Sequence, residues 1–520
     1  SGFQQSHSLN VGGGTENIKY QFSTNYFDQS GLIKNMDYNR ITVRLNTDIK
    51  VAKNLNFSAD ISTRLGKQTE PQGQEGSSWF QFGTAARTNP LTADKYSDGT
   101  WALVRGGNNP IRLQEEGGLY VYKNNLFTGN FKADYEVIKG LTLTGMASIN
   151  YRSVYNSIHN KAFDYFTDFP DNQTVLTIGQ HNIAKEYEGY WFRNFQGFAT
   201  YTKDLGHHSF KLMGGISRLS ETNDQLRGFR TNLPNGDIEQ INAGAADGQQ
   251  TEGFADAYSL LSFFGRLNYS YRDKYLLEAN LRRDGSSRFA ENQRWGWFPS
   301  FSAGWRITGE EFMKDVKFID NLKLRGSWGE LGNDIIYDQF GSPTNYPYQS
   351  PYEYNSYPFG GTLYPAAGIT RYPNSGLTWE TTRMLDFGLD LTVLKNLDVT
   401  FDYYKKTTDG ILLFLPISQT VGLDPSAQNA GKVQNTGWEL SVNYHGKIGD
   451  EFNYNIGGNL SDVRNKIVDL KGTDRISRDN NFIYTARNVG LPIDAFYGYI
   501  VEGIFQSQEQ VEGHATPPVT

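Results

Sequence analysis

Two kinds of side chain in this sequence could do binding chemistry, and the first is an arginine-rich cluster. Residues 282–288 read Arg-Arg-Asp-Gly-Ser-Ser-Arg. Guanidinium groups bind carboxylates and phosphates through two parallel hydrogen bonds. One interpretation is a charged rim that contacts a ligand or a partner protein. The other is a structural loop at a strand end, in which Asp and Gly supply the turn and Arg288 pairs with nearby carboxylates.

The second kind is aromatic. Tyr and Trp gather in two long polar stretches, 66–124 and 333–381, where their faces could stack on sugar rings and their polar tips could bind hydroxyl groups. The same residue types pack loops together and are enriched in protein interfaces, so these alternatives stay open. Our candidate contacts with substrate or a partner protein are Trp79, Trp101, Tyr346, Tyr348, Tyr352, Tyr354, Tyr357 and Arg288.

The spacing patterns of common catalytic and metal sites are missing. The sequence has no His-Glu-x-x-His, no phosphate-binding glycine-rich loop with Lys, no Gly-x-Ser-x-Gly and no cysteine. The pairs Glu115-Glu116 and Glu310-Glu311 are adjacent, so their side chains point apart instead of facing one glycosidic bond. We therefore expect no enzyme activity, no metal site and no cofactor.

Long strands must position these residues. In 38–51, the apolar residues Ile41, Val43, Leu45, Ile49 and Val51 alternate with polar residues, which gives one apolar and one polar face. We count about 16 such segments, most of them about 10 to 14 residues long, which suits a tilted strand that crosses a bilayer. They cover residues 6–13, 17–27, 38–50, 54–65, 125–137, 141–153, 190–203, 208–220, 258–272, 274–284, 296–308, 321–332, 382–394, 396–407, 436–447 and 450–463.

Short and long connections alternate between these segments. Turns such as 52–53 and 272–273 are tight, whereas 66–124, 154–189 and 333–381 are long. This alternation is typical of outer-membrane β-barrels, with short periplasmic turns and long extracellular loops. By the same parity the first strand runs toward the periplasm. We therefore expect a fragment, with at least one strand before Ser1 and further strands after Thr520.

Composition excludes several classes of protein. Aromatic residues make up 14% of the 520 residues, which is too many for a disordered chain. Hydrophobic residues reach only 38%, and no apolar run is long enough for a transmembrane helix. The net charge of -7 argues against a general nucleic-acid binder. A soluble β-sandwich or solenoid remains as an alternative, but such folds rarely sustain so many long strands.

Several segments carry a recognisable set of strings. They are NYSYRDKYLL at 268–277, RRDGSSRF at 282–289, WFPSFSAGWR at 297–306, LKLRGSWG at 322–329, LTWETT at 377–382, FDYYKKTTD at 401–409 and NTGWE at 435–439. With these strings the chain resembles the SusC-like family of TonB-dependent outer-membrane transporters of the Bacteroidetes. The resemblance spans nearly the whole chain, in order.

The resemblance implies an all-β, antiparallel transmembrane barrel of 22 strands, of which this chain would supply about 16. Residues 1–520 would form a partial barrel domain that lacks the N-terminal plug and the final strands. It also implies a SusD-like lipoprotein that covers the extracellular mouth as a lid. The missing N-terminal part would contact the TonB-ExbB-ExbD system.

On this basis we expect TonB-dependent import of oligosaccharides or other oligomeric nutrients across the bacterial outer membrane. An oligopeptide importer of the same family and a passive channel remain alternatives, because ring-rich loops suit both glycans and peptides. The expected partners are the lid, the TonB system, a glycan or peptide oligomer and outer-membrane lipid, but no nucleic acid. Aromatic residues at strand ends, such as Tyr151 and Trp438, fit the girdles that mark membrane interfaces.

Overall fold

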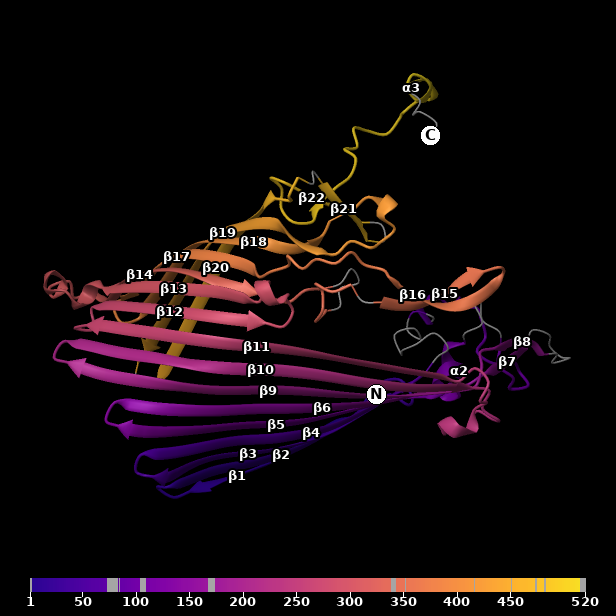
Figure 1. Cartoon of the computed structure of the whole chain (residues 1–520), viewed down its shortest axis with the longest axis horizontal. Helices are drawn as coiled ribbons and strands as arrows, with labels where there is room; N and C mark the ends of the chain where they lie inside the picture. The colour runs from indigo at the N-terminus through magenta and orange to yellow at the C-terminus, as the bar shows by residue number, and fades with distance from the viewer. Residues whose placement is uncertain are drawn as a thin grey trace. The chain divides into compact units, whose positions relative to one another are not determined.

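Sixteen long strands form one sheet in the computed structural model (Figure 1). The structure describes residues 2–72, 83, 85–102, 109–166, 174–337, 343–350, 352–415, 417–449, 451–472, 475–480 and 483–514. The strands of the sheet are β1 Gln4–Gly14, β2 Ile18–Ser30, β3 Asp37–Ala52, β4 Leu55–Pro71, β5 Leu119–Ile138, β6 Leu141–Asn160, β9 Asn182–Leu205, β10 His208–Thr231, β11 Gln250–Tyr271, β12 Tyr275–Ser286, β13 Trp295–Arg306, β14 Ile319–Asn333, β17 Glu380–Val393, β18 Leu397–Phe414, β19 Ala427–Ile448 and β20 Phe452–Asp469.

Each predicted segment overlaps one strand of this sheet, and the strands follow one another in sequence order. The all-β, antiparallel prediction is therefore confirmed. The alternation of connections is confirmed as well: β11 and β12 are joined by a tight turn in which Arg272 and Asp273 have φ of 51° and 54°. Two successive residues in the left-handed region are the signature of the hairpin turn that matches strand twist.

The strands extend further toward the long connections than the sequence pattern predicts. The pattern ends β10 near residue 220, whereas the strand continues to Thr231. The pattern begins β9 near residue 190, whereas the strand begins at Asn182. The long connections are correspondingly shorter than expected.

Short elements decorate the long connections. The hairpins are β7 Phe163–Phe166 with β8 Thr174–Ile178, and β15 Tyr352–Phe359 with β16 Thr362–Ile369; β21 Arg475–Asn480, β22 Ile483–Asn488 and β23 Ala495–Phe496 form a small sheet. The helices within the described residues are α2 Pro110–Glu115 and α3 Gln508–Glu512, with single 3-10 turns at Ile241–Ala243, Glu291–Gln293, Ile307–Gly309, Glu311–Met313 and Gln419–Val421. Among the described helices, none has the length and apolar character needed to cross a membrane.

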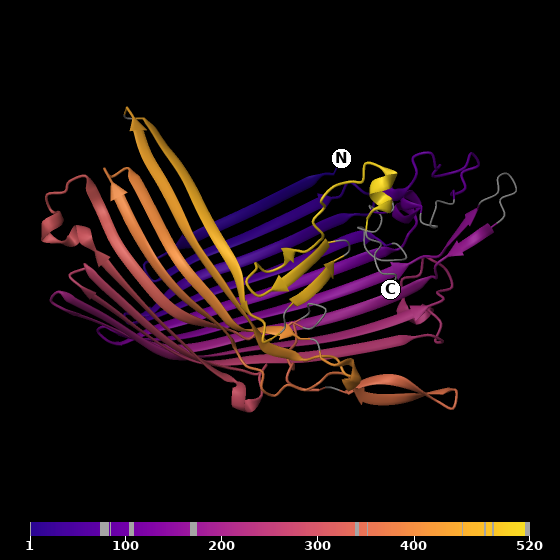
Figure 2. The same cartoon turned by 90° about the horizontal axis from the view of Figure 1, so that it is seen from above.

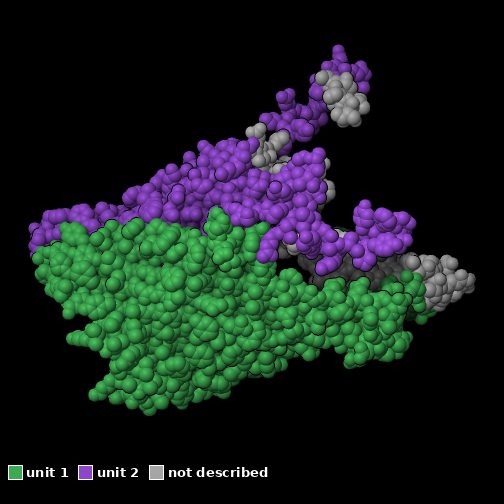
Figure 3. Space-filling model, in the orientation of Figure 1, with its two compact units in different colours: residues 1–303, 334–348 green, residues 304–333, 349–520 purple. Residues whose placement is uncertain are grey.

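The chain divides into two compact units, coloured separately in Figure 3. Unit 1 comprises residues 1–303 and 334–348, and unit 2 comprises residues 304–333 and 349–520. Within unit 2, the β15–β16 hairpin projects beyond the ends of β14 and β17, as Figure 1 and Figure 2 show.

Register separates two faces of the strands in unit 1, because residues that pair across antiparallel strands share a face. One face carries pairs such as Leu45 with Ile61 and Leu143 with Ala199. We call it the apolar face; Leu45 is 38% exposed and Leu143 is 45% exposed. The opposite, polar face carries ion pairs such as Arg44 with Asp60. A broad exposed apolar face on tilted strands is what a lipid-facing barrel wall requires.

Candidate functional site

The arginine-rich cluster folds into a buried polar network at the end of β12, in unit 1. The Nη1 atom of Arg288 lies 3.3 Å from Oδ1 of Asp334, and its guanidinium carbon lies 3.8 Å from the centre of the Tyr258 ring. The other oxygen of Asp334 accepts hydrogen bonds from the hydroxyls of Tyr258 at 2.7 Å and Ser286 at 2.6 Å. Arg288 is only 8% exposed, and its charge is balanced where it lies.

A second set of contacts extends this network along residues 334–348. The Nε atom of Arg288 donates to Oδ1 of Asn345 at 3.0 Å, and Nδ2 of Asn345 donates to Oδ2 of Asp256 at 3.0 Å. The backbone N–H of Ala257 donates to the hydroxyl oxygen of Tyr346 at 3.2 Å. We call Arg288, Asp334, Tyr258, Ser286 and Asn345 the Arg288 joint. It fastens Asp334 and Asn345 to β11 and β12, and this geometry supports the structural interpretation of Arg288.

The two arginines that precede the joint point to opposite faces of β12. The Nε atom of Arg282 lies 2.8 Å from each oxygen of Asp284, and its Nη2 atom donates to the hydroxyl of Ser262 at 2.8 Å. Arg283 lies on the apolar face, with its guanidinium carbon 4.7 Å from the Trp295 ring centre. One sequence motif therefore supplies three different environments.

Trp101 lies inside the long connection between β4 and β5 rather than on its surface. It is 7% exposed, and its indole N–H donates to Oε1 of Glu116 at 2.8 Å. The Nζ atom of Lys95 sits 3.9 Å from its ring centre, and Lys95 also lies 3.7 Å from Glu115. This geometry favours a packing role for Trp101. Trp79 falls outside the described residues.

The remaining predicted tyrosines are mostly exposed. Tyr352 and Tyr354 share one face of the β15–β16 hairpin, where they are 69% and 86% exposed, and Tyr357 lies on the other face opposite Tyr364. Tyr346 is exposed beside the Arg288 joint, and Tyr348 is half-buried. The structure therefore groups Arg288 with Tyr346 in unit 1 and Tyr352, Tyr354 and Tyr357 in unit 2.

The hairpin itself was not predicted, although the sequence contains a signal for it. Gly360 and Gly361 connect its strands, with φ of 58° and 81°. A Gly-Gly pair between two short strands is a recognised hairpin signal. Sequence reasoning missed it because the whole stretch 333–381 was interpreted as one loop.

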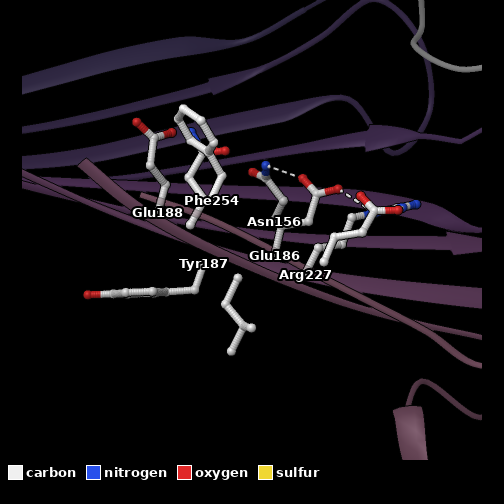
Figure 4. Close-up of a pocket in the computed structure, with 10 residues that line it drawn as sticks. Asn156, Glu186, Tyr187, Glu188, Arg227 and Phe254 are labelled. Carbon is white, nitrogen blue, oxygen red and sulfur yellow. Dashed lines mark hydrogen bonds and ion pairs between the residues drawn. The ribbon is translucent and has the colours of Figure 1, made fainter. Parts of the chain in front are cut away.

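A recess on the polar face of unit 1 was also missed (Figure 4). One register row crosses β6, β9, β10 and β11 with the residues Asn156, Glu186, Arg227 and Glu252. The Oε1 atom of Glu186 lies 3.0 Å from Nε of Arg227, Nη1 of Arg227 lies 3.3 Å from Oε1 of Glu252, and Nδ2 of Asn156 donates to Oε2 of Glu186 at 3.0 Å.

The next row completes the recess with Glu188, Gln225 and Phe254. Glu188 forms an ion pair with Arg152, and Phe254 is 57% exposed. Figure 4 shows Tyr187 pointing away from Glu186 and Glu188, as strand alternation requires. The recess is open to solvent on one side and has a volume of about 330 Å³. We call these residues the polar recess; it combines hydrogen-bond acceptors, the guanidinium group of Arg227 and an aromatic ring.

In the described part of the chain, no three His, Asp or Glu side chains gather in a way that could hold a metal ion. The Nδ1 atom of His208, the first residue of β10, lies 2.9 Å from the hydroxyl of Tyr269. The His208 ring thus forms a hydrogen bond with Tyr269 and also stacks on its ring.

Comparisons with known proteins agree with this architecture. The family described as TonB dependent receptor-like, beta-barrel matches residues 60–499. TonB-dependent receptor P3 of Formosa agariphila is 30% identical over 535 residues, which cover 98% of this chain and 50% of that protein. TonB-dependent receptor SusC of Bacteroides thetaiotaomicron is 29% identical over 534 residues, which cover 95% of this chain and 51% of that protein. The chain thus spans about half the length of these relatives.

Solved structures share the fold. The RagAB peptide importer in its open-open state superposes with a TM-score of 0.79 at 22% identity, covering 94% of this chain and 53% of that chain. The outer membrane transporter YddB from Escherichia coli superposes with a TM-score of 0.59 at 10% identity, covering 94% of this chain and 59% of that chain. Together with the lipid-facing strand faces and the alternating connections, these matches show that the chain belongs to the TonB dependent receptor-like β-barrel family, as a SusC-like β-barrel protein of the outer membrane.

Proposed function

We propose that this protein imports oligosaccharides or other oligomeric nutrients across the outer membrane, energised through TonB. The polar recess carries the proposal, because it offers hydrogen-bonding groups in a row across four neighbouring strands. Three strand spacings of about 4.8 Å make this row about 14 Å long, which exceeds a single sugar or amino acid. Carboxylate oxygens accept hydrogen bonds from hydroxyls, and the exposed ring of Phe254 can stack on a sugar face.

A SusD-like lipoprotein lid is part of the proposal. The β15–β16 hairpin supports it, since Tyr352, Tyr354, Leu363 and Ile369 are all more than 40% exposed on one of its faces. Exposed apolar patches of this kind mark protein contacts, and tyrosine is a common anchor in them. Tyr346, Tyr348 and Tyr357 remain proposed contacts with substrate or lid. The same predictions for Trp101 and Arg288 have less geometric support, because both side chains are buried.

An oligopeptide is the second candidate cargo. The alternating charges of Glu186, Arg227 and Glu252 favour it, because a peptide brings charged ends and side chains that can exchange with such pairs, whereas a neutral glycan does not. The structural neighbour RagAB is itself described as a peptide importer. The fold alone does not transfer its cargo to this chain.

Uptake by cells that make the full-length protein tests both cargoes. Labelled oligosaccharides and oligopeptides of matched length are supplied with and without a protonophore. Active import predicts accumulation of one class that stops when the proton gradient is lost. Gradient-independent uptake of both classes would instead indicate a passive channel.

The recess is tested by the double substitution Glu186→Gln and Arg227→Gln, with Lys314→Gln as the control. Lys314 forms an exposed pair with Glu311 in the connection between β13 and β14. The double variant should reduce uptake of the preferred class without lowering the amount of protein in the outer membrane. Unchanged uptake would remove the recess from the transport path.

A further inference from the structure

Three arginines on the apolar face of unit 1 have no role in the proposed transport. Arg193 lies on β9, Arg218 on β10 and Arg283 on β12, and we call them the outward arginines. Arg193 pairs with Ser220, two residues beyond Arg218 on the same strand, so these two are diagonal neighbours at about 7–8 Å. Arg283 pairs with Phe263 of β11, which in turn pairs with Ile216 of β10.

The outward arginines lie at one edge of the apolar band. From its short turn, the outward positions of β10 read Phe210, Leu212, Gly214, Ile216 and then Arg218. Those of β12 read Tyr275, Leu277, Ala279, Leu281 and then Arg283. About ten residues of a tilted strand cross the apolar band, so the arginines lie at the level where the strands leave lipid on the long-loop side.

Aromatic rings mark the same level. Trp191, next but one to Arg193, packs against Tyr151 with ring centres 4.3 Å apart. The guanidinium carbon of Arg193 lies 4.8 Å from the Trp191 ring centre, and that of Arg283 lies 5.2 Å from the Trp297 ring centre. Trp and Tyr collect at headgroup depth in membrane proteins. The outward arginines therefore sit where lipid headgroups meet the protein.

In the part of the chain that the structure describes, the outward arginines lack acidic partners, whereas arginines on the polar face, such as Arg44 and Arg227, form ion pairs. Within the described residues, none of the outward arginines forms an ion pair, and Nε of Arg283 is buried without a hydrogen-bond partner. Of the described residues at outward positions on β9 to β12, the one with a carboxylate is Asp224, and it lies six residues beyond Arg218 along β10. At this level a guanidinium group can reach the headgroup region, and without an internal carboxylate it is available to pair with an external anion.

We propose that the outward arginines bind the phosphate groups of a phosphorylated glycolipid in the outer leaflet. Guanidinium groups form paired, charge-assisted hydrogen bonds with phosphates, and the neighbouring rings suit the boundary between a sugar headgroup and acyl chains. Two strand spacings and two residues separate Arg218 from Arg283, which is about 12 Å. This spread fits a headgroup with two phosphates better than a single free anion. The proposal does not depend on what the barrel transports.

The test uses full-length protein, stripped of lipid in detergent and then supplied with bis-phosphorylated lipid A. Native mass spectrometry measures how much lipid remains bound. The test variant carries Arg193→Gln, Arg218→Gln and Arg283→Gln. The matched control carries Lys132→Gln, Lys211→Gln and Arg266→Gln, which remove the same charge from the polar face of neighbouring strands. Wild type and control should bind equally, and the test variant at least about tenfold more weakly.

Three further probes identify the source of the anion. Dephosphorylated lipid A should bind wild type as weakly as the test variant binds lipid A itself. Inorganic phosphate and phosphatidylglycerol should compete poorly. Equal binding by the test variant, equal binding of dephosphorylated lipid, or full competition by inorganic phosphate would each overturn the proposal. If the triple variant does not fold, Arg218→Gln alone decides the matter, because this exposed side chain can be changed with little effect on packing.

Discussion

The Arg288 joint and the β15–β16 hairpin both contain residues that the sequence marked as candidate contacts, yet they are opposites in structure. Arg288 is 8% exposed and its guanidinium lies against a carboxylate, an amide and a ring. Tyr354 is 86% exposed on a strand of its own small sheet. In the first region polar groups satisfy one another, whereas in the second the surface is left for another molecule. Exposure and satisfied hydrogen bonds thus separate two groups of residues that the sequence alone marks alike as candidate contacts.

The largest expected effect comes from breaking the Arg288 joint. Arg288→Ala leaves the carboxylate of Asp334 buried without its cation, which costs about 3–5 kcal/mol for a buried pair. Thermal unfolding of the purified protein in detergent should show a clear loss of stability. Limited proteolysis should also cleave the chain between residues 334 and 348 faster than in the wild type, because the substitution releases this segment.

The exposed pair of Lys314 and Glu311 is the control for this prediction. Lys314→Ala should change the free energy of unfolding by less than about 0.5 kcal/mol, because water screens exposed pairs. An Arg288→Ala protein as stable as this control would contradict the structural role of the joint.

A smaller effect is expected for Tyr258→Phe. This change keeps the ring beneath Arg288 but removes the hydroxyl that donates to Asp334 at 2.7 Å. A hydrogen bond to a charged group contributes about 1.5–3 kcal/mol. Combining Tyr258→Phe with Arg288→Ala should cost less than the sum of the two single effects, since both act on the same carboxylate. Strict additivity would show that the two residues stabilise the fold independently.

The fold was predictable because lipid imposes a simple pattern. Where one face meets lipid and the other does not, apolar and polar residues alternate, and all sixteen strands were found from this pattern. Beyond the apolar band both faces of a strand contact water, as at Glu221, Thr222 and Asn223 of β10. The alternation of apolar and polar residues therefore disappears there, while the hydrogen-bonded pairing of the strands continues. The strand ends at Thr231 could therefore not be predicted from side-chain type.

The candidate sites depended on register and distant partners, which sequence does not supply. The structural interpretation of Arg288 rested on local turn residues, but its partner Asp334 lies 46 residues away. The polar recess combines Glu186, Arg227 and Glu252 from three strands, and a shift of one residue in pairing would turn one of them to the other face. Neither arrangement could be derived from spacing along the chain.

Substitutions in the β15–β16 hairpin should leave stability unchanged and weaken binding of a partner, whereas those in the Arg288 joint lower stability. Tyr352→Ser with Tyr354→Ser should leave thermal stability within about 0.5 kcal/mol, because both side chains are exposed. If this face holds the proposed lid, the double change should weaken lid retention by about 1–2 kcal/mol, measured by co-purification across a salt and detergent series.

The other face of the hairpin provides a matched control. Tyr357→Ser with Tyr364→Ser removes the same number of rings from the opposite side. Lid retention that falls only with the first pair places the contact on the face of Tyr352 and Tyr354. Equal loss with both pairs would mean that the substitutions act on the hairpin as a whole.

The smallest effect concerns an exposed ion pair in the loops of unit 1. The Nζ atom of Lys161 lies 3.0 Å from Oδ1 of Asp237, and this hydrogen bond holds the pKa of Asp237 below its ordinary value. A lowered pKa means that the contact stabilises the folded loop above the ordinary pKa of about 3.9 and is lost as pH falls through the lower folded value. Hydrogen exchange around Asp237, corrected for its intrinsic pH dependence, should therefore show local opening only below about pH 4. Lys161→Gln should remove this pH dependence and leave the free energy of global unfolding unchanged. The pair is therefore an ion pair like that of the Arg288 joint, but, like the tyrosines of the hairpin, it contributes little to global stability. A pH response that survives Lys161→Gln would assign the effect to another carboxylate.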